Sequence, residues 1–265
     1  MQMISFCSMM TAKQVIEYME SLRDEKQREN LMRFFKTGPG EYGEDDEFLG
    51  LKVPQTRAVV RAVSKDFLLG EVPELLLSKW HEVRLCGLLI LVAKFEKLAT
   101  KRLMSDGEAI RRRDEIVEMY LEYAERANNW DLVDLSAPKI LGGWLADCPS
   151  KEMRAYKQQV VDEQARSENL WRQRMSMVCT WKTSHEGDPS WCLHYAEIHL
   201  HHPHDLMHKA VGWMLREMGK HCSLDLLRAF LRQHAHEMPR TTLRYAIEKM
   251  SEVERKEWMC YEGLS

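Results

Sequence analysis

A helical period of apolar residues constrains this chain more than any other sequence feature. Apolar side chains recur three and four positions apart from about residue 11 to residue 250. No segment shows the alternation of apolar and polar residues, bounded by turn residues, that is typical of a half-buried strand. The run LLILV at residues 88–92 lies inside a longer helical pattern, so we expect a buried helix there. The sequence therefore predicts an all-α fold.

The expected helices come in pairs that repeat about every 35–45 residues, which is the spacing of HEAT-type two-helix repeats. We therefore expect a curved solenoid, an α-α superhelix, that forms a single domain over residues 11–265 and follows a disordered segment at residues 1–10. A compact multi-helix enzyme domain is the alternative. The expected helices are Thr11–Leu22, Glu25–Lys36, Pro54–Phe67, Glu71–Trp80, Glu82–Leu98, Asp106–Ala127, Asn128–Trp144, Ser150–Ala165, Ser167–Ser184, Asp188–Leu200, His204–His221, Ser223–His234, Pro239–Met250 and a short last helix from Ser251.

Composition narrows the class of protein. No apolar run approaches the roughly 20 residues of a membrane span, and the first ten residues lack the basic leader and apolar core of a secretory signal. Seven scattered cysteines fit a reducing compartment, so we expect a cytoplasmic protein, with a monomer as the simplest state. The net charge of −3 does not by itself favour nucleic-acid binding, but acid is concentrated in Glu41–Glu47 and basic residues in the late helices.

Asn128–Trp144 holds an unusual pair of side chains. We expect one helix, bent near Ser136 because Pro138 lies inside it, and capped by an asparagine at 128 or 129. Its buried stripe is formed by Val133, Ala137, Ile140, Leu141 and Trp144. Trp130 and Asp134 lie one turn apart at the edge of this stripe. Alternatively, Asp134 is a charge favoured by the helix dipole and Trp130 packs against a neighbouring repeat.

Basic residues share helix faces with tryptophans later in the chain. Arg174 shares a face with Trp171 and Trp181. In His204–His221 a core stripe of methionines and Val211 runs beside a stripe formed by Lys209, Trp213, Arg216 and Lys220, and Arg240 and Arg244 lie one turn apart further on. Such faces suit a phosphate backbone with a flat group beside it. The alternative is a set of solvated faces, with Trp213 in the core.

The histidine-rich region Cys192–His208 is a candidate for metal binding. His and Cys are common ligands of transition metals, but the spacing around Pro203 does not match a fixed tetrahedral pattern. A solvated turn is the better interpretation. We therefore expect no metal site and no cofactor.

Several motifs resemble the AlkD family of DNA alkylation-repair glycosylases. They are NWDLVD at residues 129–134, LWRQR at 170–174 and HKAVGWMLRE at 208–217. MRFFKT at 32–37 and FLGLKVPQTR at 48–57 are similar to the opening of the family. The resemblance covers about residues 11–250 and implies a curved stack of HEAT-like repeats.

The resemblance also implies residue roles. Trp130 and Trp213 match the two tryptophans that contact the deoxyribose of the lesion, Asp134 matches the catalytic carboxylate, and Arg174 matches a residue that holds the DNA backbone. The family removes cationic alkylpurines such as N3-methyladenine and N7-methylguanine from duplex DNA, without drawing the lesion into a deep pocket. The implied partner is double-stranded DNA that contains alkylated bases.

These residue types suit that chemistry. A cationic purine leaves without protonation, so no general acid is needed. Positive charge then develops on the sugar, where indole faces and one carboxylate stabilise it. Asp134 acts electrostatically, or orients or deprotonates the attacking water, and both roles stay open.

Two features depart from the family pattern. The loop Gly38–Asp46 is acidic and would repel phosphate, and Phe34 stands where we expect a tyrosine hydroxyl near the DNA. Two other functions therefore stay open. One is a non-catalytic binder of distorted or branched DNA. The other is a helical-repeat scaffold for a protein partner, with Trp130 and Trp213 as interaction hot spots.

Overall fold

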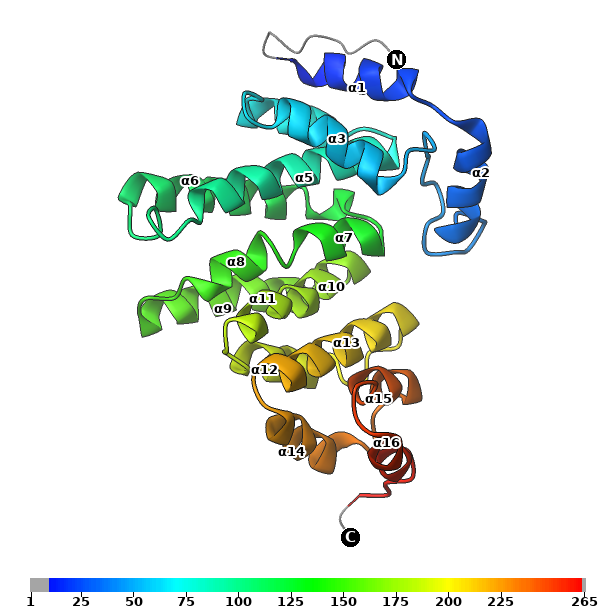
Figure 1. Ribbon diagram of the computed structural model, residues 1–265, viewed down its shortest axis with the longest axis vertical. Helices are drawn as coiled ribbons and strands as arrows, with labels where there is room; N and C mark the ends of the chain where they lie inside the picture. The colour runs from blue at the N-terminus through cyan, green and yellow to red at the C-terminus, as the bar shows by residue number, and fades with distance from the viewer. Residues whose placement is uncertain (1–9, 264–265) are drawn as a thin grey trace. The chain divides into compact units, whose positions relative to one another are not determined.

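The computed structural model describes residues 10–263, and its secondary structure is helical (Figure 1). The described residues contain no strand, and a single isolated bridge joins Glu47 to Trp80. The all-α prediction is thus confirmed. None of the described helices combines the length and apolarity that a membrane span requires. The disorder expected at the N-terminus falls, for residues 1–9, outside the described residues.

The chain forms two compact units, Met1–Ser136 and Ala137–Ser265. The boundary falls directly after the helix that carries Trp130 and Asp134. Each unit is built from packed helices, as two-helix repeats require. The curved solenoid itself stays a prediction.

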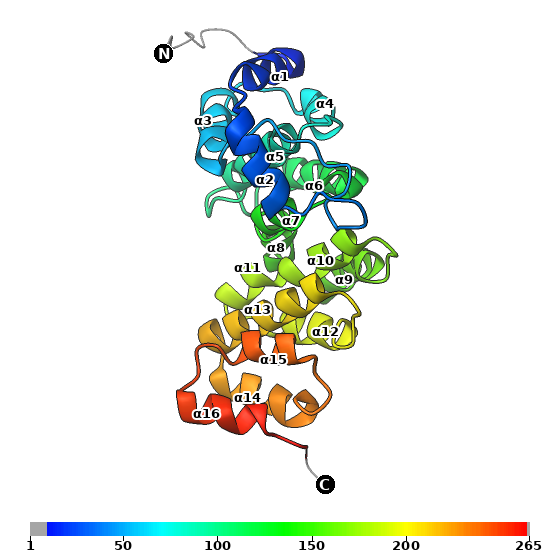
Figure 2. The same ribbon diagram turned by 90° about the vertical axis from the view of Figure 1, so that its right-hand side faces the viewer.

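The first unit is organised around one long buried helix, α5 (His81–Leu98). Every residue of α5 from His81 to Val92 is buried, because α3, α4, α6 and α7 pack around it. Figure 2 shows this unit from the side of α2. Its other elements are α1 (Ala12–Ser21), α2 (Glu25–Phe34), α3 (Val53–Val63), η1 (Leu69–Glu71), α4 (Val72–Leu76), α6 (Gly107–Glu122), η2 (Ala124–Arg126) and α7 (Trp130–Ser136).

The segment between α2 and α3 is held against α5 by a buried carboxylate. Glu82, 2% exposed, accepts backbone N–H groups from Leu49, Gly50 and Leu51 at 2.8, 2.8 and 3.0 Å. Gly50 has φ +91°, and a Cβ there would lie 2.1 Å from the Asp24 carbonyl oxygen. The connection therefore needs glycine at this position and an acid on α5.

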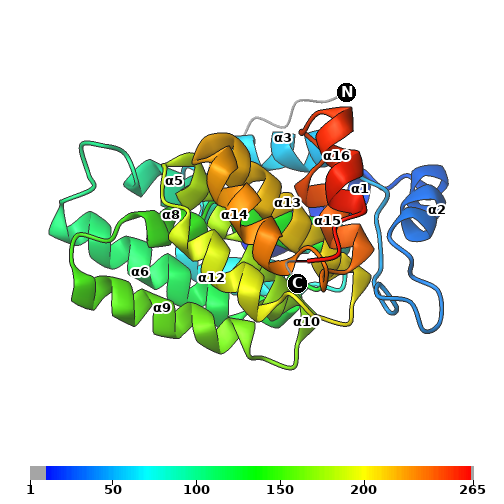
Figure 3. The ribbon, with the colours of Figure 1, turned by 90° about the horizontal axis from the view of Figure 1, so that it is seen from below.

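The second unit is organised around α13 (Asp205–His221), which packs against α10, α11, α12, α14 and α15. Figure 3 shows this unit with its C-terminal helices toward the viewer. The expected core stripe is confirmed, since Met207, Val211, Met214 and Met218 are all buried. The other helices are α8 (Leu141–Ala146), α9 (Lys151–Ala165), α10 (Leu170–Val178), α11 (Thr180–His185), α12 (Ser190–Ile198), α14 (Leu224–His234), α15 (Arg240–Ala246) and α16 (Glu252–Met259).

Two expected helices are each broken in two. Asn128–Trp144 is not one bent helix, because α7 ends at Ser136 and α8 begins at Leu141, with Pro138 in the turn between them. Proline lacks the N–H that would continue the helix. Ser167–Ser184 is divided between α10 and α11 at Cys179, whose carbonyl oxygen lies 2.4 Å from where a Cβ on Gly142 would be. The stripe expected over residues 133–144 is nevertheless buried throughout.

Candidate active site

Trp130 and Asp134 occupy the first and second turns of α7, as expected. Asn129 precedes the helix and is fully buried, and its Oδ1 accepts the Trp130 backbone N–H at 2.9 Å. The Val133 backbone N–H donates to the Asn129 carbonyl at 3.2 Å. The start of α7 is therefore held by Asn129, while Trp130 and Asp134 are both half-buried.

Both side chains line a cleft of about 450 Å³ within the first unit. A cleft of this volume falls in the range of small-ligand sites. Its wall is mostly apolar, and Asp131, Asp134 and Glu82 contribute carboxylates. The full lining consists of Leu31, Phe34, Phe35, Phe48, Leu51, Lys52, Val53, Pro54, His81, Glu82, Leu85, Trp130, Asp131, Asp134 and Leu135.

An aromatic stack fixes Trp130 against α2. The ring of Phe35 stacks on the indole at a centroid distance of 5.4 Å, and Phe48 stacks on Phe35 at 5.2 Å. Phe34 meets Trp130 edge-on at 5.9 Å and is 62% exposed at the cleft. Phe34 therefore offers a hydrocarbon edge where the sequence analysis expected a hydroxyl group.

A buried ion network, which the sequence patterns did not predict, lies beside this stack. His81 Nδ1 lies 2.7 Å from an Asp46 carboxylate oxygen, and His81 Nε2 lies 3.0 Å from an Asp131 oxygen. Arg84 donates to the other oxygen of Asp46. The His81 ring stacks on Phe48 at 4.4 Å. The network thus links the loop after α2, the start of α5 and the start of α7.

Electrostatics make His81 a cation at neutral pH. Burial alone would lower the pKa of His81, but Asp131 and then Asp46 raise that pKa to about 9. Burial works against ionised Asp46, yet His81 and Arg84 hold the pKa of Asp46 below its usual value. A sequence signal for this network existed. His81, Glu82 and Arg84 are charged residues in the first turn of a helix that continues with the apolar run of residues 85–93, and buried charges require partners.

The acidic loop is a structural part of the first unit. Asp46 is 4% exposed within the network, and Glu47 pairs with Lys79 at 3.3 Å. A Cβ on Gly43 would lie 2.4 Å from the Phe35 carbonyl oxygen, so the loop packs closely under the end of α2. Part of the negative charge that we expect to repel DNA is therefore neutralised by ion pairs within the first unit.

The remaining candidate residues belong to the second unit. Trp213 is half-buried on α13. Arg174 is only 4% exposed, and its guanidinium donates to the Leu206 carbonyl in the first turn of α13. This bond ties α10 to the start of the helix that carries Trp213, and the contact of Arg174 with the DNA backbone stays a prediction.

In the expected basic stripe of α13, Lys209, Trp213 and Arg216 are half-buried and Lys220 is exposed, and the cations differ in their acidic partners. Lys209 pairs with Asp205 at 2.7 Å, and Arg216 bonds both Glu217 and Glu248. Within the described part of the chain, no ion pair with a carboxylate involves Lys220, Arg240 or Arg244, and all three are exposed. These three side chains therefore carry the less compensated positive charge.

The histidines of Cys192–His208 act as hydrogen-bonding groups. His199 contacts Ser176 Oγ at 2.8 Å, His202 contacts Gln173 at 2.8 Å, and His204 accepts the Leu206 N–H at 3.1 Å. His208 donates to the His202 carbonyl at 2.5 Å. These hydrogen bonds hold the turn in place.

A different group in the second unit brings metal-ligand types together. Among residues 10–263, His185, Glu217 and His221 have ligand atoms within 4.8 Å of one another. The His185 and His221 rings are tilted against each other, with centroids 3.6 Å apart and planes at 31°. Lone pairs lie in the ring planes, so the rings would have to turn to meet at one ion. Both imidazoles lie near Glu217 Oε2, and Arg216 donates to Glu217 Oε1 at 3.0 Å.

Comparison with known proteins assigns a family to this architecture. The model of the family described as "DNA alkylation repair enzyme" matches residues 15–250. A solved structure described as "Predicted DNA alkylation repair enzyme from Enterococcus faecalis" matches with a TM-score of 0.62 and 13% identity. The match covers 87% of this chain and 97% of that chain, which shows a shared fold. No curated protein matches the sequence.

Proposed function

This chain belongs to the DNA alkylation repair enzyme family, and on that premise we propose that it is a DNA glycosylase for cationic alkylpurines. The enzyme would hydrolyse the N-glycosidic bond of lesions of the N3-methyladenine and N7-methylguanine type in duplex DNA. It would act as a cytoplasmic monomer without a metal or cofactor. The observation that carries the proposal is the presence of Asp134 and Trp130 on the wall of one apolar cleft.

The chemistry of such a lesion requires little more than this pair. The alkylated purine is already cationic, so it departs as a neutral base without a proton donor. The positive charge passes to the deoxyribose, where the Asp134 carboxylate and the Trp130 indole face lower its energy. A water molecule then attacks the anomeric carbon and gives up a proton, and Asp134 orients or deprotonates this water. The apolar lining strengthens the electrostatic effects, because it lowers the local dielectric constant. One carboxylate suffices, in contrast to the pair that sugar hydrolases use.

In this proposal the second unit supplies contacts to DNA. Trp213 is assigned the second deoxyribose contact. Lys220, Arg240 and Arg244 are assigned the phosphate backbone, because no carboxylate among residues 10–263 pairs with their charges. Lys209 and Arg216 contribute less, since each already has an acidic partner. Arg174 is assigned the positioning of α13, through its bond to Leu206.

The decisive experiment measures release of free base from a duplex that contains N7-methylguanine. Asp134→Asn should lower the rate by about 10²–10³-fold, the usual cost of removing one preorganised electrostatic group. DNA affinity should stay unchanged. Glu118→Gln, an exposed acid on α6, is the matched control and should release base at the wild-type rate.

The same assay separates the alternatives. Salt-dependent DNA binding without release by wild type would overturn the proposal in favour of a non-catalytic binder. Absence of salt-dependent DNA binding would favour a protein-interaction scaffold instead. A duplex with an uncharged lesion such as 1,N6-ethenoadenine should not be processed. Its release would contradict the argument that the leaving base needs no protonation.

A further inference from the structure

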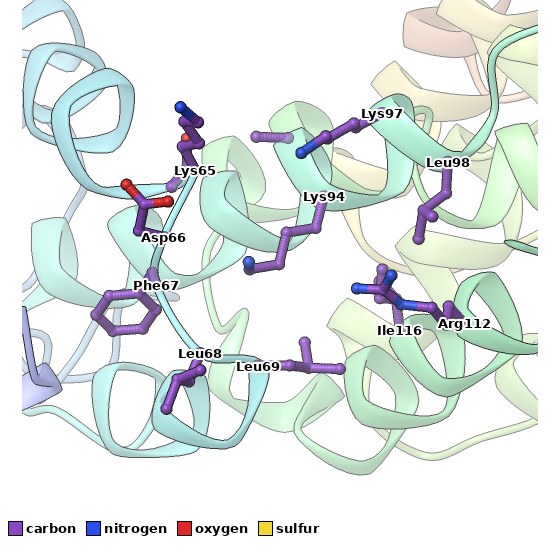
Figure 4. A pocket seen from close by; sticks show the side chains of 12 residues that line it. Lys65, Asp66, Phe67, Leu68, Leu69, Lys94, Lys97, Leu98, Arg112 and Ile116 are labelled. Carbon is purple, nitrogen blue, oxygen red and sulfur yellow. The ribbon is translucent and has the colours of Figure 1, made fainter. Parts of the chain in front are cut away.

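A second cavity of about 660 Å³ lies in the first unit, bounded by the end of α3, the segment before η1, and helices α5 and α6 (Figure 4). It is distant from Trp130. His81 and Lys94 stand 13 residues apart on α5, and at 1.5 Å per residue this corresponds to about 20 Å. The proposed glycosylase function makes no use of this cavity.

The cavity combines an apolar wall with cationic side chains. Phe67, Leu69, Leu98 and Ile116 provide apolar surface. Lys65, Lys94, Lys97 and Arg112 provide positive charge, and Asp66 is the one carboxylate in the lining. In Figure 4 the amino groups of Lys94 and Lys97 and the guanidinium of Arg112 extend into the same space from α5 and α6.

Among residues 10–263, Asp66 compensates these cations only in part. Within residues 10–263, no ion pair or side-chain hydrogen bond involves Lys94, Lys97 or Arg112, whereas Arg111 on the same helix α6 pairs with Glu108. Burial, then Arg112 and Lys97, lower the pKa of Lys94, and Asp66 only partly opposes them. A bound anion would relieve this repulsion.

We propose that this cavity binds a small phosphorylated molecule, with Lys94, Lys97 and Arg112 around the phosphate and the organic body against Phe67, Leu69 and Ile116. A phosphate dianion matches a cluster of three cations better than a single carboxylate does, and a guanidinium can bind two of its oxygens at once. The apolar wall selects a ligand with an apolar or aromatic body. The cavity volume lies within the range of small-molecule sites, whereas a duplex backbone follows an open basic surface.

The experiment titrates the full-length protein by calorimetry with phenyl phosphate, inorganic phosphate and phenol. Phenyl phosphate should bind with a Kd of about 1 mM or tighter, inorganic phosphate more weakly, and phenol not measurably. Binding should strengthen between pH 5 and pH 7, because the second phosphate ionisation occurs near pH 6. Equal affinity for phenol and phenyl phosphate, or no heat with phenyl phosphate, would overturn the proposal.

Variants locate the site. Lys94→Met and Arg112→Leu keep the side-chain stems and should each weaken phenyl phosphate binding about 10-fold, with unchanged thermal unfolding. Lys97→Met provides a third variant if either one is unstable. Lys101→Met, an exposed lysine shortly after α5, is the matched control and should bind as wild type. Wild-type affinity in Lys94→Met and Arg112→Leu would refute the site. Loss of duplex DNA affinity in the same variants would reassign it to nucleic acid.

Discussion

The ring of Phe35 stacks on the indole of Trp130 with centroids 5.4 Å apart and planes at 30°. Phe35 directly follows α2, and Trp130 begins α7, so the contact joins an early helix of the first unit to its last helix. Phe35 also stacks on Phe48 and lies 5.0 Å from the His81 ring. The indole is therefore held by residues that lie far earlier in the chain.

Phe35→Leu should slow base release more than it weakens DNA binding. The variant removes the ring that fixes the indole plane, and a misplaced group commonly costs about 10–10²-fold in rate. Release kinetics and fluorescence anisotropy of the same duplex measure the two effects. Phe230→Leu on α14 truncates a buried phenylalanine of the second unit and serves as the control for lost stability. Equal rates of base release by Phe35→Leu and wild type would show that the stack does not fix the orientation of the Trp130 indole.

Stability of the first unit should fall in mildly alkaline solution. Because the pKa of His81 is raised to about 9, its ion network stabilises the folded state fully below the unfolded pKa of 6.5 and loses this contribution as pH rises through 9. The total loss is about 3 kcal/mol at most. Urea unfolding at pH 6, 7.5 and 9.5 measures it.

Asp131→Asn tests the origin of that pH dependence. Asp131 is the stronger of the two carboxylates that raise the pKa of His81, so its removal should shift the stability loss to lower pH. Asp225→Asn, at an exposed acid on α14, should leave the profile of the first unit unchanged. An identical profile for Asp131→Asn and wild type would exclude His81 as the titrating group.

DNA affinity should depend on Lys220 and Arg240 more than on Arg216. Each neutralised phosphate contributes to the salt dependence, so Lys220→Ala and Arg240→Ala should each reduce the slope of log affinity against log salt by about 1. Arg216 already bonds Glu217 and Glu248, so Arg216→Ala should change the slope less. Anisotropy titrations between 50 and 200 mM salt give the slopes. A larger effect for Arg216→Ala would place DNA on another face of α13.

Gly212→Ala should destabilise the second unit by about 1–3 kcal/mol. A Cβ at Gly212 would lie 2.4 Å from the Thr242 carbonyl oxygen and 2.5 Å from Tyr245 Cβ, so α15 would have to move away from α13. Gly70→Ala is the matched control, because nothing lies within 4 Å of the added carbon. Thermal unfolding of both variants checks the difference.

Helix positions could be predicted from the sequence because the helical period of apolar residues depends only on residues a few positions apart. The expected helices Glu82–Leu98 and His204–His221 correspond to α5 and α13 within one residue at each end. The methionine stripe of α13 is buried for the same reason. The predictions of one continuous helix over Asn128–Trp144 and one over Ser167–Ser184 were wrong. A turn of a few residues at Pro138 breaks the first, and the close packing of Gly142 against Cys179 lies at the break in the second. Neither feature changes the period of apolar residues in the sequence.

The sequence by itself determined the helices, their buried faces and the neighbouring positions of Trp130 and Asp134 on one turn. Only the tertiary structure decided what surrounds that pair. His81 meets Asp46 and Asp131 from 35 and 50 residues away, and Arg174 turns inward to a carbonyl 32 residues later. Contacts at such separations depend on how packed helices exclude water and force buried charges to find partners, and no short-range pattern encodes that outcome.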